Sequence, residues 1–311
     1  MSVFGWIAVG GLLALCATQW VGFDQWRPVA VLQAMTPYLL GLALPIGVAA
    51  AITGEWWMAA ACVVVLATLA GLVAPAIRAE QAPGNAGEAG AMLSIFFGNL
   101  LAWNPNPGEA MAVVAATGAD VLVLAEFNPD MHAALVAACG DRYAHRLEDV
   151  RPDPAGIALW STVPFTGDMV PLSDRPAIDA VLDVDGRPLR VIGLHTEPPT
   201  MRARAWSREL RELGDRADEG DAAMPVVLLG DYNAARWHPS FRRLLARGWV
   251  TAHEWLGQWH SNSWANEGRA LPLFVRIDHA LLRGPVTPVR ITDVPLPDSD
   301  HCGFVVTVSL G

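Results

Sequence analysis

Three apolar runs in the first 77 residues constrain this chain more than any other feature of its sequence. Val3–Ala17, Pro37–Ile52 and Trp56–Ile77 contain no charged residue. A bilayer core takes about 20 apolar residues per helix. The third run is therefore long enough by itself, and the other two are long enough with their flanking residues. We predict that residues 1–77 form a membrane region with about three transmembrane helices, with two helices as the alternative.

The ends of these runs carry the aromatic residues expected where a helix meets the membrane surface: Trp6, Trp20, Trp26, Tyr38, Trp56 and Trp57. The first run could instead be a signal peptide, but no basic residue precedes it and no clear cleavage site follows. We therefore expect it to remain as an anchor in a multi-pass protein of the cell membrane. Arg27 and Arg78 are the only basic residues of this region, too few to indicate which side the rest of the chain faces.

The composition changes after the third run. Residues 78–90 are rich in Gly, Ala and Pro, as in a flexible linker, and residues 91–311 have the composition of one soluble domain. The chain carries a net charge of −10 and has no lysine, so it lacks the basic surface of a strong, nonspecific duplex binder. Its four cysteines form no zinc pattern and imply no disulfide framework.

Pro225–Asn233, PVVLLGDYN, is the central element of the predicted domain. Its apolar block predicts a strand covered on both faces. Asp231 and Asn233 follow two residues apart, a spacing that places both side chains on one face of an extended chain. There the carboxylate could take a proton from water while the amide holds a phosphate oxygen. Gly, Asp and Asn are also ordinary turn residues, so a simple turn stays open.

Other predicted strands also end in polar residues. Met92–Leu101 ends near Asn99, and Asp120–Phe127 carries Glu126 inside an apolar run, where a carboxylate is costly unless paired or bound to a cation. His195 closes Leu189–His195. The remaining polar residues are Asp278, which interrupts Phe274–Leu282, and Asp300 and His301, which lead into the last strand.

Together these segments resemble, in order, the motif set of the endonuclease/exonuclease/phosphatase superfamily, also called DNase I-like. The matching segments are Asn99 in GNLL, Glu126 in DVLVLAEF, His195 in GLH, GDYNA at 230–234, IDH at 277–279 and SDH at 299–301. The superfamily contains nucleases, inositol polyphosphate 5-phosphatases and neutral sphingomyelinases. The chain resembles a membrane-anchored, bacterial-type member.

The resemblance implies an α/β fold, a four-layer α/β/β/α sandwich preceded by the transmembrane helices. It implies that Glu126, Asn99 and Asp300 bind Mg²⁺, with Mn²⁺ as the alternative. It further implies that Asp231 activates water and Asn233 holds a phosphate oxygen. His195 and His301, the latter oriented by Asp278, would then contact the phosphate and stabilise charge in the transition state.

Some features depart from the superfamily or stay open. Thr162 follows Ser161 where many relatives carry a phosphate-contacting Arg, so an Arg from Arg202–Arg211 or Arg236 is a candidate substitute. Trp255 and Trp259 lie in the segment 253–264, either packed on the core or facing substrate.

The sequence therefore predicts a metal-dependent phosphoesterase, foremost a phosphodiesterase or nuclease. The alternatives are a phospholipid or inositol-phosphate hydrolase and a catalytically inactive, membrane-tethered binding module. A phosphoester substrate and the lipid bilayer are the implied partners, and no protein partner is implied.

Overall fold

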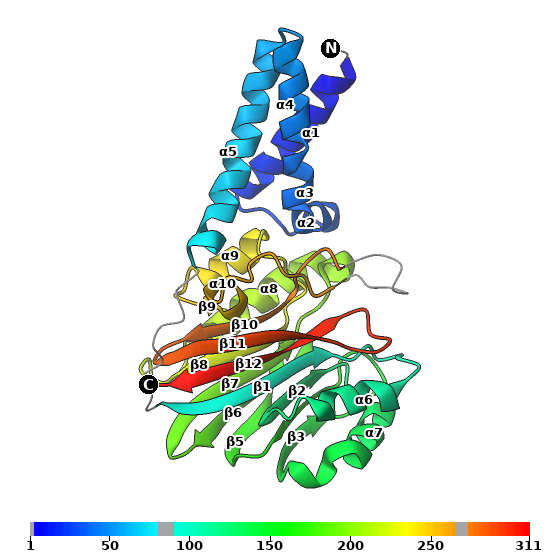
Figure 1. Ribbon diagram of the computed structural model, residues 1–311, viewed down its shortest axis with the longest axis vertical. Helices are drawn as coiled ribbons and strands as arrows, with labels where there is room; N and C mark the ends of the chain where they lie inside the picture. The colour runs from blue at the N-terminus through cyan, green and yellow to red at the C-terminus, as the bar shows by residue number, and fades with distance from the viewer. Residues whose placement is uncertain (1–2, 80–89, 265–272) are drawn as a thin grey trace.

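The computed structural model describes residues 3–79, 90–264 and 273–311. A bundle of apolar helices stands at one end of an elongated molecule, and two stacked β-sheets form the other (Figure 1). The bundle helices are α1 (Val3–Trp20), α2 (Arg27–Ala34), α3 (Thr36–Gly41), α4 (Ala43–Ile52) and α5 (Trp56–Arg78).

Two of these helices, α1 and α5, are long and apolar enough to cross a membrane. The predicted span Pro37–Ile52 is divided between α3 and α4, and α2 meets this pair at a bend of 67°. Among the described residues the chain therefore has two candidate spans, or three if α2 and the segment Thr36–Ile52 are counted together as one bent span. The break is at Met35, just before α3, and Pro37 stands in the first turn of α3, where proline fits best.

The first sheet has six strands in the order β11-β12-β1-β2-β4-β3, of which only β1 and β2 pair in parallel. These strands are β1 (Ala91–Asn99), β2 (Val121–Ala125), β3 (His145–Asp149), β4 (Ile157–Ser161), β11 (Val286–Pro295) and β12 (Cys302–Leu310). Its outer face is covered by α6 (Pro107–Ala116) and α7 (Pro129–Cys139), which is followed by the short 3₁₀ helix Gly140–Arg142.

The second sheet also has six strands, in the order β5-β6-β7-β8-β10-β9, with β7 and β8 parallel. These strands are β5 (Phe165–Leu172), β6 (Arg175–Val184), β7 (Arg187–His195), β8 (Val226–Asp231), β9 (Val250–Thr251) and β10 (Asp278–Arg283). Its outer face packs on α8 (Pro199–Ala217) and α9 (Pro239–Leu245), and α10 (Ala252–Trp255) follows β9.

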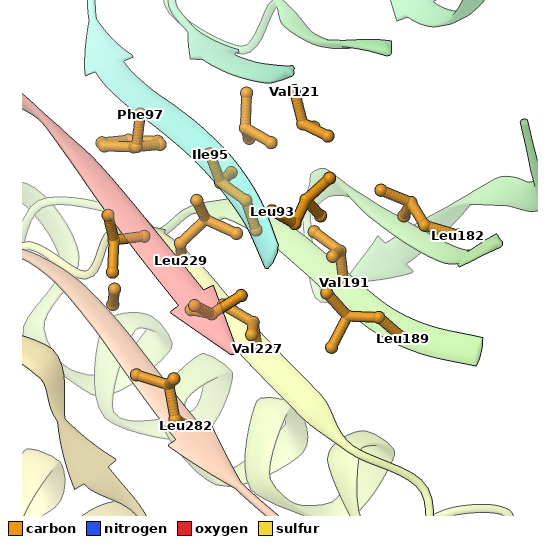
Figure 2. Packing of buried hydrophobic residues seen from close by; sticks show 14 of the residues in the cluster. Leu93, Ile95, Phe97, Val121, Leu182, Leu189, Val191, Val227, Leu229 and Leu282 are labelled. Carbon is orange, nitrogen blue, oxygen red and sulfur yellow. The ribbon is translucent and has the colours of Figure 1, made fainter. Parts of the chain in front are cut away.

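The main core lies between the two sheets. Figure 2 shows Ile95 and Phe97 of β1 packed with Leu229 of β8 and Val191 of β7, all fully buried. Every residue of β8 is buried, so the prediction of a strand covered on both faces is confirmed. Helix, sheet, sheet and helix stack in that order, which confirms the predicted four-layer α/β/β/α fold.

Several local predictions differ from the structure. Asn233 has φ +47°, so the chain turns there and the expected extended spacing from Asp231 is wrong. Its backbone N–H donates to Asp231 Oδ1 at 2.8 Å, which is an Asx turn. The strand predicted over Phe274–Leu282 begins only at Asp278. The strands β3, β5 and β11, most of whose residues are half-buried or exposed, and the two-residue strand β9 were not predicted.

Candidate functional site

The polar strand ends meet at one rim of the sandwich. Register brings them together within the second sheet, because Asp231 at the end of β8 pairs with both His195 of β7 and Asp278 of β10. Asn99 lies at the end of β1 in the first sheet, next to Ala125 of β2. Its side-chain amide donates to Asp231 Oδ2 at 3.0 Å. The site is therefore built from both sheets.

Asp231 is the centre of this cluster and is 1% exposed. Burial and the nearby Asp278 carboxylate raise its pKa to about 7, although His301, Asn99 and the Asn233 backbone N–H favour the charged form. A carboxylate that titrates near neutral pH can both accept and release a proton under working conditions. Gly230 precedes it because a Cβ there would lie 2.2 Å from the Leu194 backbone oxygen.

Glu126 follows β2 and turns its carboxylate toward Asn99. Its φ is +58°, a left-handed conformation that costs roughly 1–2 kcal/mol for a residue with a Cβ. Oε1 accepts from Asn99 Nδ2 at 3.0 Å and Oε2 from the Ala102 backbone N–H at 2.7 Å. Backbone strain of this kind persists where the surrounding structure fixes the residue, and it is concentrated at functional sites.

His301 and Asp278 form a buried ion pair. His301 Nδ1 lies 2.8 Å from Asp278 Oδ2, and Ser263 donates to the same oxygen at 2.6 Å. Burial opposes charge on the ring, but the carboxylates of Asp278, Asp231 and Asp300 outweigh it and raise the pKa of His301 to about 10. The ring is therefore an imidazolium whose other nitrogen, Nε2, lies 3.7 Å from Asp231.

His195 is the second imidazole of the site and differs in charge. Burial, with Arg175 and His301 nearby, holds its pKa well below the ordinary value, so the ring is neutral. Arg175 Nη1 lies 3.3 Å from His195 Nδ1 and donates to the Pro154 carbonyl at 3.1 Å. The same Nδ1 lies 3.1 Å from the Pro154 carbonyl, to which a protonated Nδ1 would donate, so its surroundings fit either neutral tautomer. Nε2 of the ring faces Asp231 at 3.5 Å and Glu126 at 3.9 Å.

Asp300 and Asn233 complete the set. Asp300 Oδ2 accepts from the indole N–H of Trp264 at 3.1 Å, and Asn233 Nδ2 donates to the Thr196 carbonyl at 3.0 Å. Ser299 ties this segment to the first sheet by donating to the Asn99 carbonyl at 2.8 Å. All eight predicted site residues therefore lie at the same rim.

Two groups of side chains could hold a cation. Ligand atoms of Asp231, Asp278 and His301 lie within 4.8 Å of one another. Asp278 and His301 already neutralise each other, which makes them poor metal ligands. Glu126 and Asn99 offer oxygen atoms, the donors that Mg²⁺ and Mn²⁺ prefer. The side-chain nitrogen of Asn99 donates to the carboxylates of Glu126 and Asp231. A cation would therefore be bound by the side-chain oxygen of Asn99, which accepts from the Leu101 N–H.

The cluster opens into a cavity of about 510 Å³. Six predicted residues line it: Glu126, His195, Asp231, Asn233, Asp300 and His301. Asn99 and Asp278 are buried behind them and act through Asp231, Glu126 and His301. The lining residues within the described part of the chain include no arginine. The suggested phosphate ligand Arg236 instead pairs with Glu254 at 2.8 Å, and Arg202 pairs with Asp174.

Sequence reasoning missed three residues that contact the site. Arg175 comes from the start of β6, and Ser263 and Trp264 lie in the segment 253–264. Trp264 forms antiparallel bridges with Val275 and His301. Trp255 and Trp259, the residues singled out in that segment, do not line the cavity. The helical spacing of Trp255 and Trp259 singled out those two residues. Trp264 had one sequence signal, its place at the end of the same aromatic segment.

Comparison with solved structures finds the same fold in proteins of low sequence identity. TDP2 from D. rerio, in complex with a single-strand DNA product, is 19% identical with a TM-score of 0.61, covering 70% of this chain and 99% of that one. Sphingomyelinase C from Streptomyces griseocarneus is 20% identical with a TM-score of 0.53, covering 71% and 99%. An endonuclease/exonuclease/phosphatase protein from Beutenbergia cavernae is 21% identical with a TM-score of 0.55, covering 71% and 72%.

A search of curated proteins gave no match. The model of the Endonuclease/Exonuclease/phosphatase family matches residues 91–301, which is more than half of the chain and includes every strand end described above. Fold, order of motifs and family model agree, and the chain belongs to the Endonuclease/Exonuclease/phosphatase family.

Proposed function

We propose that this protein is a membrane-anchored, divalent-metal-dependent phosphodiesterase. One observation carries the proposal: the buried Asp231 carboxylate, the Asp278-paired imidazole of His301 and the imidazole of His195 all meet at one cavity. A phosphodiester is an anion that repels an anionic nucleophile. The charged ring of His301 can neutralise one of its oxygens, with the neutral ring of His195 beside it, while Asp231 stays available as the base.

The metal we propose is Mg²⁺, with Mn²⁺ as the alternative. Glu126, Asn99 and Asp300 would hold it, because they supply the hard oxygen donors it prefers beside the cavity. When bound, it would supply positive charge to a phosphate oxygen.

The reaction follows from the side chains. Asp231 would orient a water molecule and take its proton as the water oxygen bonds to phosphorus. The phosphorus–oxygen bond to the leaving group breaks, and that oxygen takes a proton, for which the Nε2–H of His301 is the nearest charged donor. The Asn233 amide would hold a non-bridging oxygen, with the His195 ring beside it. Asp278 keeps His301 charged and oriented through its 2.8 Å contact.

The alternative of an inactive binding module is less consistent with these interactions. Keeping Asp231, Asp278 and Glu126 together under low exposure costs free energy through burial and mutual repulsion. A module that only binds would lose nothing by replacing Asp231 with an uncharged residue. Retention of the complete set favours turnover.

The test is hydrolysis of bis(p-nitrophenyl) phosphate by the full-length protein in detergent, with Mg²⁺, Mn²⁺ or EDTA. We expect metal-dependent release of p-nitrophenol, lowered on the order of 10²–10⁴-fold in kcat by Asp231→Asn and by His301→Ala. Asp168→Asn, an exposed acid on the edge strand β5, is the matched control and should keep wild-type activity. Equal activity in Asp231→Asn, or activity in EDTA, would refute the proposal.

A further inference from the structure

One wall of the catalytic cavity comes from the membrane region. Ala30, Val31 and Ala34 of α2, with Met35 after them, line the same cavity as His195 and Asp231. In Figure 1, α2 lies across α8 and α9 at the base of the helical bundle. The cavity therefore has a catalytic side built from strand ends and a side built from a helix of the N-terminal bundle.

Specific contacts hold α2 in this position. His238 Nε2 lies 2.8 Å from the Ala30 carbonyl, and Arg27 donates to the Met201 carbonyl of α8. Before α2, the fully buried Asp24 accepts from both the backbone N–H and the hydroxyl of Ser240, at 2.6 and 2.8 Å. After α2, Tyr38 donates to the Phe274 carbonyl at 2.8 Å. Contacts on both sides of the helix make it a fixed part of the cavity.

The cavity is apolar away from the catalytic cluster. Beside α2 it is lined by Pro198, Pro199, Phe274, Val275 and Ile277. A nucleic acid that binds through its backbone needs cationic side chains for several phosphates. No arginine stands among the lining residues of the described chain, and the sequence has no lysine. The described lining therefore joins one polar cluster, Asp231 with His195 and His301, to apolar walls.

The apolar wall also adjoins the helices that could enter a bilayer. In Figure 1, α1 and α5 both end at the end of the bundle where α2 lies, while the start of α5 lies at the far end of the bundle. Exposed tryptophans mark both levels, with Trp20 and Trp26 near α2 and Trp56 and Trp57 at the far end. The 23 residues of α5 span about 34 Å, close to the thickness of a bilayer core. The cavity lies at the membrane-proximal end of the domain.

We infer that the substrate is a membrane lipid whose head group is joined by a phosphoester, with the apolar part of the lipid against α2 and its phosphate at Asp231, His195 and His301. This inference rests on the proposed phosphodiesterase activity and deepens it. The helix α2 is then part of the substrate site, and Val31 is a specificity-determining residue, because it lines the cavity and is 45% exposed.

The test compares two neighbouring substitutions on α2 in the full-length protein in nanodiscs. Val31→Asp places a charge in the apolar part of the cavity. Leu32→Asp places the same charge on the next residue, which is 47% exposed and does not line the cavity. Substrates are phosphatidylcholine, phosphatidylglycerol, phosphatidylinositol and sphingomyelin in the disc, a single-stranded DNA oligonucleotide, and bis(p-nitrophenyl) phosphate in solution.

We expect at least one lipid to be hydrolysed faster than the DNA. Val31→Asp should lower the ratio of kcat/KM for that lipid to kcat/KM for bis(p-nitrophenyl) phosphate by about tenfold or more, and Leu32→Asp should leave the ratio unchanged. Ala34→Leu, which narrows the cavity without adding charge, should lower the same ratio if Val31→Asp fails to fold.

The inference is overturned if the DNA is cleaved and no lipid is, or if Val31→Asp and Leu32→Asp change the ratio equally. In either case, cleavage of bis(p-nitrophenyl) phosphate that depends on Asp231 would leave the proposed phosphodiesterase activity standing. If the wild-type protein does not cleave bis(p-nitrophenyl) phosphate, the proposed function itself is refuted.

Discussion

At the scale of single residues, the site depends on two identical side chains held in different states. His301 is charged because three carboxylates surround it, and His195 is neutral because burial and Arg175 oppose its charge. Both rings direct Nε2 toward Asp231, at 3.7 and 3.5 Å. The two rings differ in charge because Nδ1 of His301 faces the Asp278 carboxylate, whereas Nδ1 of His195 lies near the Arg175 guanidinium.

This difference makes Arg175 a positioning residue whose loss can be measured. Arg175→Met removes the positive charge beside His195 Nδ1 and the donor to the Pro154 carbonyl, two contacts that hold the ring in place. We expect kcat for bis(p-nitrophenyl) phosphate to fall about 10–100-fold, with a smaller change in KM. Arg202→Met is the control, because Arg202 forms an exposed pair with Asp174. Equal kcat values in the two variants would exclude the positioning role.

The motif residues could be predicted from sequence because each is a polar residue within, or at a boundary of, an apolar strand, and because their order resembles that of a known superfamily. Arg175 could not, since nothing local distinguishes it from the other arginines and its role arises only when β6 and β7 pair. The pattern of apolar and polar residues could not predict the conformation of Asn233 either, because the sequence Gly-Asp-Tyr-Asn fits both a turn and an extended chain.

At the scale of elements, helix α8 contains a carboxyl group on the face that packs on the sheet. Glu209 is fully buried on its inner face and accepts from the Glu197 backbone N–H at 2.7 Å through Oε2, while Oε1 has no hydrogen-bond partner among the described residues. Burial raises the pKa of this carboxyl to about 7, although Arg175 and the Glu197 N–H favour the charged form and Glu197 and Asp174 oppose it. The charged form is therefore unfavourable in the folded protein.

The consequence is a stability that depends on pH. In an unfolded chain this carboxyl titrates near 4.5. The stability that it contributes to the folded protein is therefore fully present below pH 4.5 and is lost as the pH rises through about 7. Glu209→Gln keeps an acceptor and removes the titration. We expect the variant to be more stable than wild type by on the order of 2 kcal/mol at pH 8, and no more stable at pH 4.5.

Thermal unfolding of the full-length protein in detergent, followed by tryptophan fluorescence at both pH values, measures this difference. Glu212→Gln, a half-exposed acid one turn along the same helix, is the control. A gain in Glu209→Gln that is the same at both pH values would contradict the assignment.

At the scale of the whole molecule, the helical bundle and the sandwich are joined by contacts between residues far apart in sequence. Asp24 and Ser240 are separated by 216 positions, and Tyr38 and Phe274 by 236. Composition predicted the bundle and motif order predicted the sandwich. Neither could predict that α2 would enter the cavity, because that position depends on these few long-range hydrogen bonds.

Removing one of these contacts should loosen the junction without touching the catalytic cluster. Asp24→Ala leaves the Ser240 N–H and hydroxyl without their acceptors, at a cost of roughly 1–3 kcal/mol. We expect faster hydrogen exchange in α2 and α9, with exchange in β8 unchanged. Gln25→Ala, an exposed neighbour, serves as the control. Unchanged exchange in both helices after Asp24→Ala would mean that other contacts alone hold α2 in place.

The position of α2 also affects how this protein can be studied. A fragment that begins after the helical bundle would keep every catalytic residue, yet its cavity would have lost one side. Pro198, Phe274 and Ile277 would then face water, and such a fragment would be prone to self-association and open to substrates that the intact protein excludes. Activities measured on the fragment would report a broader specificity than the cell encounters.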